Sequence, residues 1–137
     1  MALKVELKPG EKLIVGSCVI TNADQRTRLF IEGKAPILRE KDILSPETAD
    51  TPAKAIYLAV QIMYVEGAVD KLSKSYFSLV NDLVSAVPST LSLVDQINNE
   101  ILTGDLYKAL KVAKKLIAYE RELLENAASG GTGLSQG

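Results

Sequence analysis

Apolar and polar residues alternate along the first 44 residues, as they do in half-buried β-strands. In the first stretch, Lys4 and Glu6 separate apolar neighbours. The second stretch is apolar on both faces apart from Gly16 and Ser17, which predicts a strand covered on both sides. Turn-forming residues at 22–25 predict a hairpin between the second and third stretches. The predicted strands are residues 3–7, 13–20, 26–33 and 37–44.

The period changes after residue 50, where apolar residues begin to recur every three or four positions, as on one face of a helix. Thr51 and Pro52 form a helix-start signal, with threonine as the N-cap and proline at the first helical position. Gly104 is predicted to end the third helix and Asp105 to cap the fourth. Four apolar stripes follow one another, beginning at Ile56, Leu72, Leu91 and Leu106.

These patterns predict an α+β protein. We expect a small antiparallel β domain at residues 1–48 and a helical hairpin or bundle of about four helices at residues 49–127. The Gly/Ser-rich residues 128–137 are predicted to be a disordered tail.

The composition narrows the class of protein further. Hydrophobic residues make up 47% of the chain and aromatic residues 5%, so the core should be aliphatic. Residues 1–44 carry a net charge of +2 and residues 45–137 a net charge of −3. A single cysteine, Cys18, fits a reducing compartment, and neither a signal peptide nor a membrane-length apolar run is visible. We therefore expect a cytoplasmic protein with no membrane partner.

The residues that usually carry out catalysis are scarce. Histidine is absent, one cysteine makes no zinc site, and no phosphate-binding glycine motif appears. The carboxylates Glu120, Glu122 and Glu125 are interpreted as a solvated helix face rather than an acid/base pair. We expect no enzyme activity, no cofactor and no metal site.

Cations collect on strand faces that the alternation predicts to be exposed. In the predicted strand 26–33, Arg26 and Arg28 share a face with Phe30. In the predicted strand 37–44, which is expected to lie beside it, Arg39 shares a face with Lys41. Arginines bind phosphate and an aromatic ring can stack on an unpaired base, so these faces suggest RNA binding. The alternative is that the outward charges simply protect the edges of a sheet, which is common.

The residues MALKVELKPGEKLIVG, VITNADQRTRLFIEGKAPILREKDIL and SPETADTPAKAIYLAVQIMY resemble the FlbT family of flagellar regulators over about residues 1–120. The resemblance implies binding to the 5′ untranslated region of flagellin mRNA, with lower translation and faster message decay while the hook is incomplete. Some members of the family act positively instead. A second small protein, FlaF, is the protein partner that the resemblance suggests.

The N-terminal half is also similar, more distantly, to CsrA, a small β-rich dimer that binds RNA and represses translation. The matches are GEKLIVG at 10–16, Ala35-Pro36, and Arg39-Glu40 with Ile43. The similarity makes Arg39 the counterpart of an RNA-contacting arginine. Leu7 and Lys8 stand where CsrA proteins have two arginines, a departure that puts CsrA-type sequence recognition in doubt.

Two functional hypotheses follow from these observations. The first is an RNA-binding translational regulator, with Lys8, Arg26, Arg28, Arg39 and Lys41 as the RNA-binding residues. The second is a protein-interaction or chaperone-like module of flagellar assembly that uses the helical half, although the apolar stripes of that half can equally pack on one another. We expect that the sheet edges are covered either by a second copy, in a homo-oligomer, or by the chain's own helices.

Overall fold

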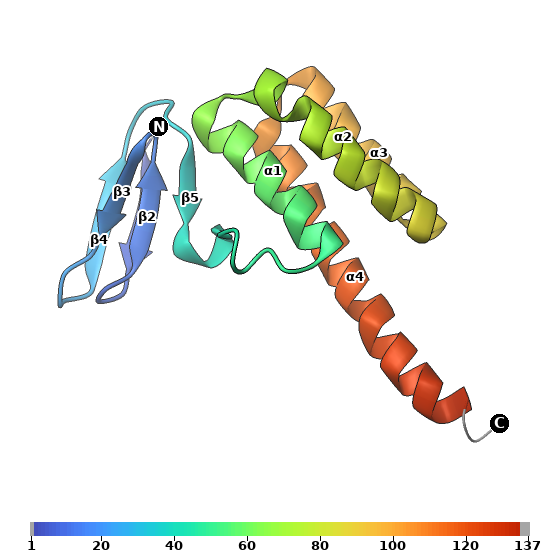
Figure 1. Ribbon diagram of the computed structural model, residues 1–137. Coiled ribbons are helices and arrows are strands. Elements are labelled where there is room, and N and C mark those ends of the chain that lie inside the picture. The colour runs from blue at the N-terminus through green and yellow to red at the C-terminus, as the bar shows by residue number, and fades with distance from the viewer. Residues whose placement is uncertain (1, 135–137) are drawn as a thin grey trace. The chain divides into compact units, whose positions relative to one another are not determined.

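The computed structural model describes residues 2–134 and divides into two compact units, a β unit and a helical unit (Figure 1). Of the described residues, 2–43 and 64–67 form the β unit, and 44–63 and 68–134 form the helical unit. The first contains antiparallel strands in two small sheets and the second contains four α-helices, which confirms the predicted α+β class. Among the described residues, no helix combines the length and apolar composition needed to cross a bilayer.

The first sheet pairs the first strand with the fourth. β1 (Leu3–Leu7) runs antiparallel to β4 (Thr27–Ile31), with Val5 opposite Leu29. Val5 and Leu7 are buried, whereas Lys4 and Glu6 are exposed, so the alternation predicted for this strand is confirmed.

The second sheet has the order β3-β2-β5, formed by β2 (Lys12–Val15), β3 (Cys18–Thr21) and β5 (Ile37–Arg39). The prediction of one continuous strand over 13–20 is wrong, because Gly16 and Ser17 turn the chain into a β2–β3 hairpin. Gly16 has φ +61°, which glycine adopts without strain and which hairpin turns require.

Residues 22–25 do not form the predicted hairpin turn, because β3 and β4 belong to different sheets. They connect the two sheets, and hydrogen bonds from the Asn22 side-chain amide stabilise this connecting segment. It donates to the carbonyl oxygens of Leu7 at 3.1 Å, Lys8 at 2.9 Å and Gln25 at 2.8 Å.

The last strand is shorter than predicted. β5 ends at Arg39, and residues Glu40–Asp42 form a 3₁₀ turn, η1, instead of continuing the strand to residue 44. The other end of β5 is held by the Tyr64 hydroxyl, which accepts from the Ile37 amide at 3.1 Å and donates to its carbonyl at 3.2 Å.

The two sheets share a small aliphatic core. Val5, Leu7 and Leu13 are fully or almost fully buried. Partly buried residues from both sheets pack against them, namely Val15, Leu29, Ile31 and Ile37. All four residues of β3 are exposed, so the described chain does not cover this strand, and the oligomeric state stays a prediction.

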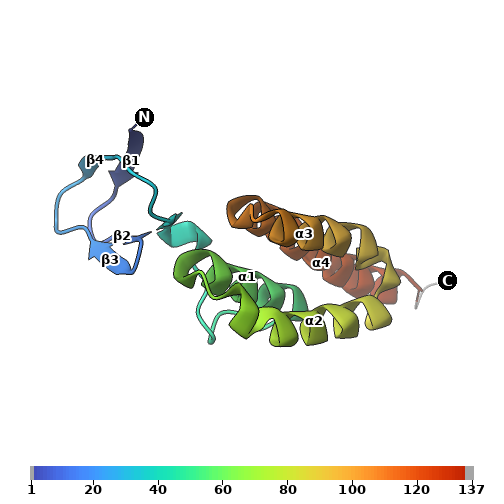
Figure 2. The ribbon, with the colours of Figure 1, turned by 90° about the horizontal axis from the view of Figure 1, so that it is seen from above.

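The helical unit contains α1 (Pro52–Glu66), α2 (Val69–Ala86), α3 (Leu91–Thr103) and α4 (Leu106–Leu134), with a short 3₁₀ turn, η2 (Pro88–Thr90), before α3. α3 packs along α4 (Figure 2). The predicted stop at Gly104 is confirmed, since this residue caps α3 with φ +84°. The largest fully buried apolar side chains of the unit are Tyr76, Ile56, Met63, Ile97 and Leu116, with Val60 and Val94.

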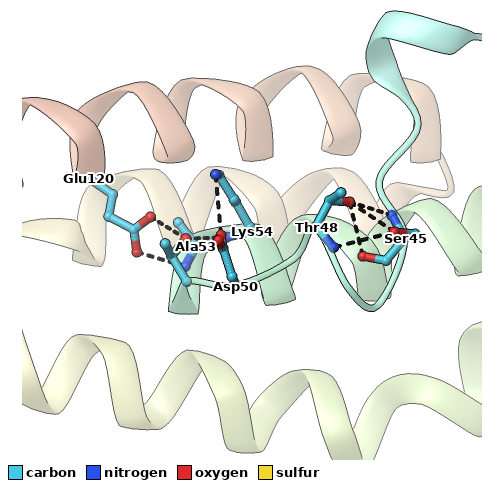
Figure 3. Close-up of polar contacts among 7 residues, drawn as sticks. Ser45, Thr48, Asp50, Ala53, Lys54 and Glu120 are labelled. Atoms are coloured by element: carbon cyan, nitrogen blue, oxygen red, sulfur yellow. Dashed lines mark hydrogen bonds and ion pairs between the residues drawn. The ribbon is translucent and has the colours of Figure 1, made fainter.

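The start of α1 is tied to α4 by a carboxylate (Figure 3). Thr51 Oγ1 donates to Glu120 Oε1 at 2.5 Å, and the Ala53 amide donates to Glu120 Oε2 at 2.9 Å. The Thr51 hydroxyl also accepts from the Lys54 amide at 3.3 Å, as the predicted N-cap should. The interpretation of Glu120 as part of a solvated helix face is therefore wrong, because α4 directs this side chain toward the Thr51 hydroxyl and the Ala53 amide at the beginning of α1.

α4 continues as helix to Leu134, past residue 128, where the disordered tail was predicted to begin. The prediction rested on the Gly/Ser-rich composition of the segment, which is typical of flexible linkers and disordered segments. Residues 135–137 of the predicted tail lie outside the described residues.

Candidate nucleic-acid interface

The outward face of the β1–β4 sheet carries an exposed aromatic ring among cations. Cross-strand pairing sets Lys4 opposite Phe30 and Glu6 opposite Arg28, and side chains of paired residues share a face. Phe30 is 67% exposed, a large fraction for an aromatic side chain in a strand. The shared face of Arg28 and Phe30, predicted from the alternation, is confirmed.

Glu6 organises the arginines on this face. Its carboxylate lies 3.4 Å from a guanidinium nitrogen of Arg28 and 3.7 Å from one of Arg26, which stands just before β4. All three side chains are substantially exposed, so these ion pairs are screened by water and are weak. Exposed Glu32 directly follows β4, so Lys4, Arg26 and Arg28 are accompanied by two acids, Glu6 and Glu32, and the face keeps a net charge of +1.

Arg39 and Lys41 do not join this face through strand pairing. β5 lies in the other sheet, so it is not the neighbour of β4 that the sequence suggested. Arg39 opposes Leu13 in the register at the end of β5, and its side chain is exposed. Lys41 lies in the 3₁₀ turn, where strand alternation does not apply, so the prediction that it shares a strand face with Arg39 is wrong.

Lys8 follows β1 directly and is exposed. Its amide donates to the Glu11 carboxylate at 2.8 Å, within the turn that leads to β2. Lys8 thus belongs to the rim of the β1–β4 sheet rather than to its paired face.

Lys4 is the residue that the sequence analysis missed. The alternation places it on the exposed face of its own strand, but only the pairing of β1 with β4 brings it opposite Phe30. The sequence pattern therefore predicted that Lys4 is exposed, but it did not show that β4 is the strand that pairs with β1.

We call the set Lys4, Arg26, Arg28 and Phe30 the aromatic-basic face. Its chemistry suits single-stranded nucleic acid: cations bind phosphates, and an exposed ring stacks on a base whose edges are unpaired.

A groove lies in the helical unit. An open groove of about 390 Å³ has mostly apolar walls, built from α2, α3 and the end of α1. Its lining includes Met63, Val69, Tyr76, Phe77, Ile101 and Leu102. Phe77 is 50% and Leu102 is 82% exposed, so apolar surface faces solvent here. At its base the Tyr76 hydroxyl donates to Asn98 Oδ1 at 2.6 Å, and burial raises the pKa of this phenol.

Comparison with known proteins gives one consistent result. The family described as "Flagellar protein FlbT" matches residues 3–124. A protein of Bradyrhizobium diazoefficiens named "Probable flagellum biosynthesis repressor protein FlbT 1" is 62% identical over 124 residues, covering 90% of this chain and 85% of that protein. The "Flagellum biosynthesis repressor protein FlbT" of Caulobacter vibrioides is 38% identical over 133 residues, covering 95% and 94%. No solved structure matches.

Proposed function

Because the chain belongs to the FlbT family of flagellar proteins, we propose that it is a post-transcriptional regulator that binds the 5′ untranslated region of flagellin mRNA. The names of its relatives, which describe repressors of flagellum biosynthesis, support a regulator of flagellar expression. The observation that carries RNA binding is the aromatic-basic face, where Phe30 is 67% exposed opposite Lys4 and two residues from Arg28.

The aromatic-basic face offers two kinds of contact to RNA, one with phosphates and one with a base. Lys4, Arg26 and Arg28 neutralise phosphates, which gives affinity and salt dependence. Phe30 stacks on an unpaired base, so the face favours single-stranded leader over duplex. Bound leader is then withheld from translation, and Lys8 lies at the rim to extend the contact. Arg39, at the end of β5, and Lys41, in η1, contribute when the bound RNA extends beyond the β1–β4 sheet.

Replacing Phe30 by alanine tests this proposal. Loss of one stacked base costs roughly 1–3 kcal/mol, or about 5- to 150-fold in affinity for a flagellin leader RNA in a mobility-shift assay. Phe77→Ala is the matched control, because this phenylalanine is also exposed but lies in the helical unit. Arg28→Ala should flatten the salt dependence by about 0.7 in slope, as expected for one lost phosphate contact on a single strand.

The proposal fails if Phe30→Ala binds the leader as tightly as the unaltered protein. It also fails if Phe77→Ala weakens binding equally, since the effect would then not belong to the aromatic-basic face.

A second candidate function is protein interaction through the groove of the helical unit. The observation that favours it is the exposed apolar pair at the groove, Phe77 and Leu102. A flagellar protein such as FlaF would be held there by its own apolar side chains. Capture of FlaF that survives ribonuclease and is lost in Leu102→Ser supports this function, whereas loss of capture after ribonuclease alone contradicts it.

A further inference from the structure

The exposed side of α4 carries a row of cations that belongs to neither of the surfaces described so far. Between residues 107 and 121 the buried positions are Ala109, Leu110, Ala113 and Leu116, which face the bundle. The exposed positions on the other side are Tyr107, Lys108, Lys111, Lys114, Lys115, Ala118 and Arg121. We call these five lysine and arginine residues the α4 basic row.

Charge in the helical half is segregated rather than mixed. Residues 45–137 contain eight cations, of which five lie in the α4 basic row, and eleven acids. The one acid within residues 106–121 is Glu120, and its carboxylate is turned away to bond Thr51 and Ala53. Although the net charge of residues 45–137 is −3, residues 106–121 within them have a net charge of +4.

The arrangement is unfavourable for an isolated helix. Lys111 stands three residues from Lys108 and Lys114 and four from Lys115, and like charges at these spacings repel across the helix surface. Lys108 also lies in the first turn of α4, where the helix dipole disfavours a cation. An ordinary solvated helix alternates charge signs along its face, which lowers this repulsion.

Asp105 and Tyr107 provide local partners for two cations of the row. Asp105 caps the helix by accepting from the Lys108 amide at 3.1 Å and lies 3.8 Å from the Lys108 ammonium. The Lys111 ammonium stands 4.9 Å from the centre of the Tyr107 ring, a cation–π contact that holds it above the helix surface. An external polyanion would relieve the repulsion along the whole row.

We propose that the α4 basic row binds the phosphate backbone of RNA as a second contact surface, and this inference rests on the proposed RNA-binding function. Lysine ammonium groups bind phosphate as point charges, without selecting a base. From Lys108 to Arg121 the row extends roughly 20 Å along the helix, at 1.5 Å per residue, long enough for several successive phosphates.

An anionic membrane is the less suitable partner. A helix that lies on a bilayer inserts an apolar face beside its cations. In α4 that face is buried in the bundle through Leu110, Ala113 and Leu116, so it is not available to lipid.

The test removes two adjacent cations from the row. Lys111→Ala/Lys115→Ala should bind a flagellin leader RNA and an unrelated RNA of equal length more weakly by the same factor. The slope of log affinity against log salt should fall in magnitude by about 1.4, which is 0.7 for each phosphate contact on a single strand. Lys71→Ala/Lys74→Ala is the matched control, since it removes two exposed charges from α2 of the same unit and should leave the slope unchanged.

Each outcome decides between the possibilities. If the unaltered protein binds neither RNA, the proposed function and this inference are both overturned. If it binds the leader and Phe30→Ala weakens binding while the α4 variant keeps the original slope, this inference alone is overturned. Equal slope changes in the α2 control, or capture by phosphatidylserine vesicles that needs Lys111 and Lys115 while RNA binding does not, would overturn it as well.

Discussion

The carboxylate of Glu120 joins α4 to the beginning of α1, and its removal should destabilise the helical unit. In Glu120→Ala the Thr51 hydroxyl and the Ala53 amide both lose their acceptor. Ala53 is fully buried, so its amide is poorly placed to bond water instead. The variant also loses a negative charge at the positive end of the α1 dipole.

The size of the effect follows from these losses. A hydrogen bond to a charged group contributes about 1.5–3 kcal/mol in favourable cases, and a charge near a helix end contributes about 0.3–1 kcal/mol. Glu120 is only half-buried, which reduces both figures because water screens the charge. We therefore expect Glu120→Ala to lower the free energy of unfolding by about 2 kcal/mol, and Glu120→Gln, which keeps one acceptor oxygen, by about 1 kcal/mol.

Urea unfolding followed by helical circular dichroism is the suitable assay, because the signal comes mainly from the unit that contains both residues. Glu122→Ala is the control, since Glu122 is an exposed carboxylate on the same helix. The reasoning is refuted if Glu120→Ala unfolds within about 0.5 kcal/mol of the unaltered protein, the range of ordinary surface substitutions. It is equally refuted if the control is destabilised as much.

Two further predictions concern a buried phenol and an exposed acid. Burial raises the pKa of Tyr76, so the fold should lose stability as pH rises above the unfolded value of about 10. Tyr76→Phe should lack this alkaline loss, yet cost about 1–2 kcal/mol at neutral pH in thermal unfolding because Asn98 loses its donor. Glu6→Gln frees Arg26 and Arg28, so it should tighten leader RNA binding with little effect on stability, and weaker binding would show that Glu6 positions the arginines.

Periodicity along the sequence located the helices and most of the strand segments. It did not show which strands pair with one another. The helix start at Thr51-Pro52 and the stop at Gly104 depend on nearby residues, and both predictions are confirmed. The hairpin at Gly16 was missed because apolar residues on both sides of the turn resemble one continuous strand. A turn with two residues interrupts the alternation too little to be seen in the hydrophobic pattern alone.

The candidate site shows the same limit. Parity assigns Arg28 and Phe30 to one face because the rule operates within a single strand. Parity alone could not show whether Arg39 lies in the same sheet as Arg28 and Phe30, because sheet membership depends on pairing between segments that are distant in the sequence. Glu120 was misassigned for a related reason, since its partners lie more than 60 residues away in sequence.

The two proposed RNA-contacting surfaces differ in what the sequence could disclose. For the aromatic-basic face, exposure of an aromatic residue was predicted from alternation, and pairing then supplied Lys4. For the α4 basic row, average charge pointed the other way, because residues 45–137 contain eleven acids and only eight cations. Only the burial of Leu110, Ala113 and Leu116 shows which side of α4 is free to meet a partner. A net charge close to zero therefore does not exclude a nucleic-acid-binding protein whose cations are confined to particular faces, since phosphate contacts depend on local charge.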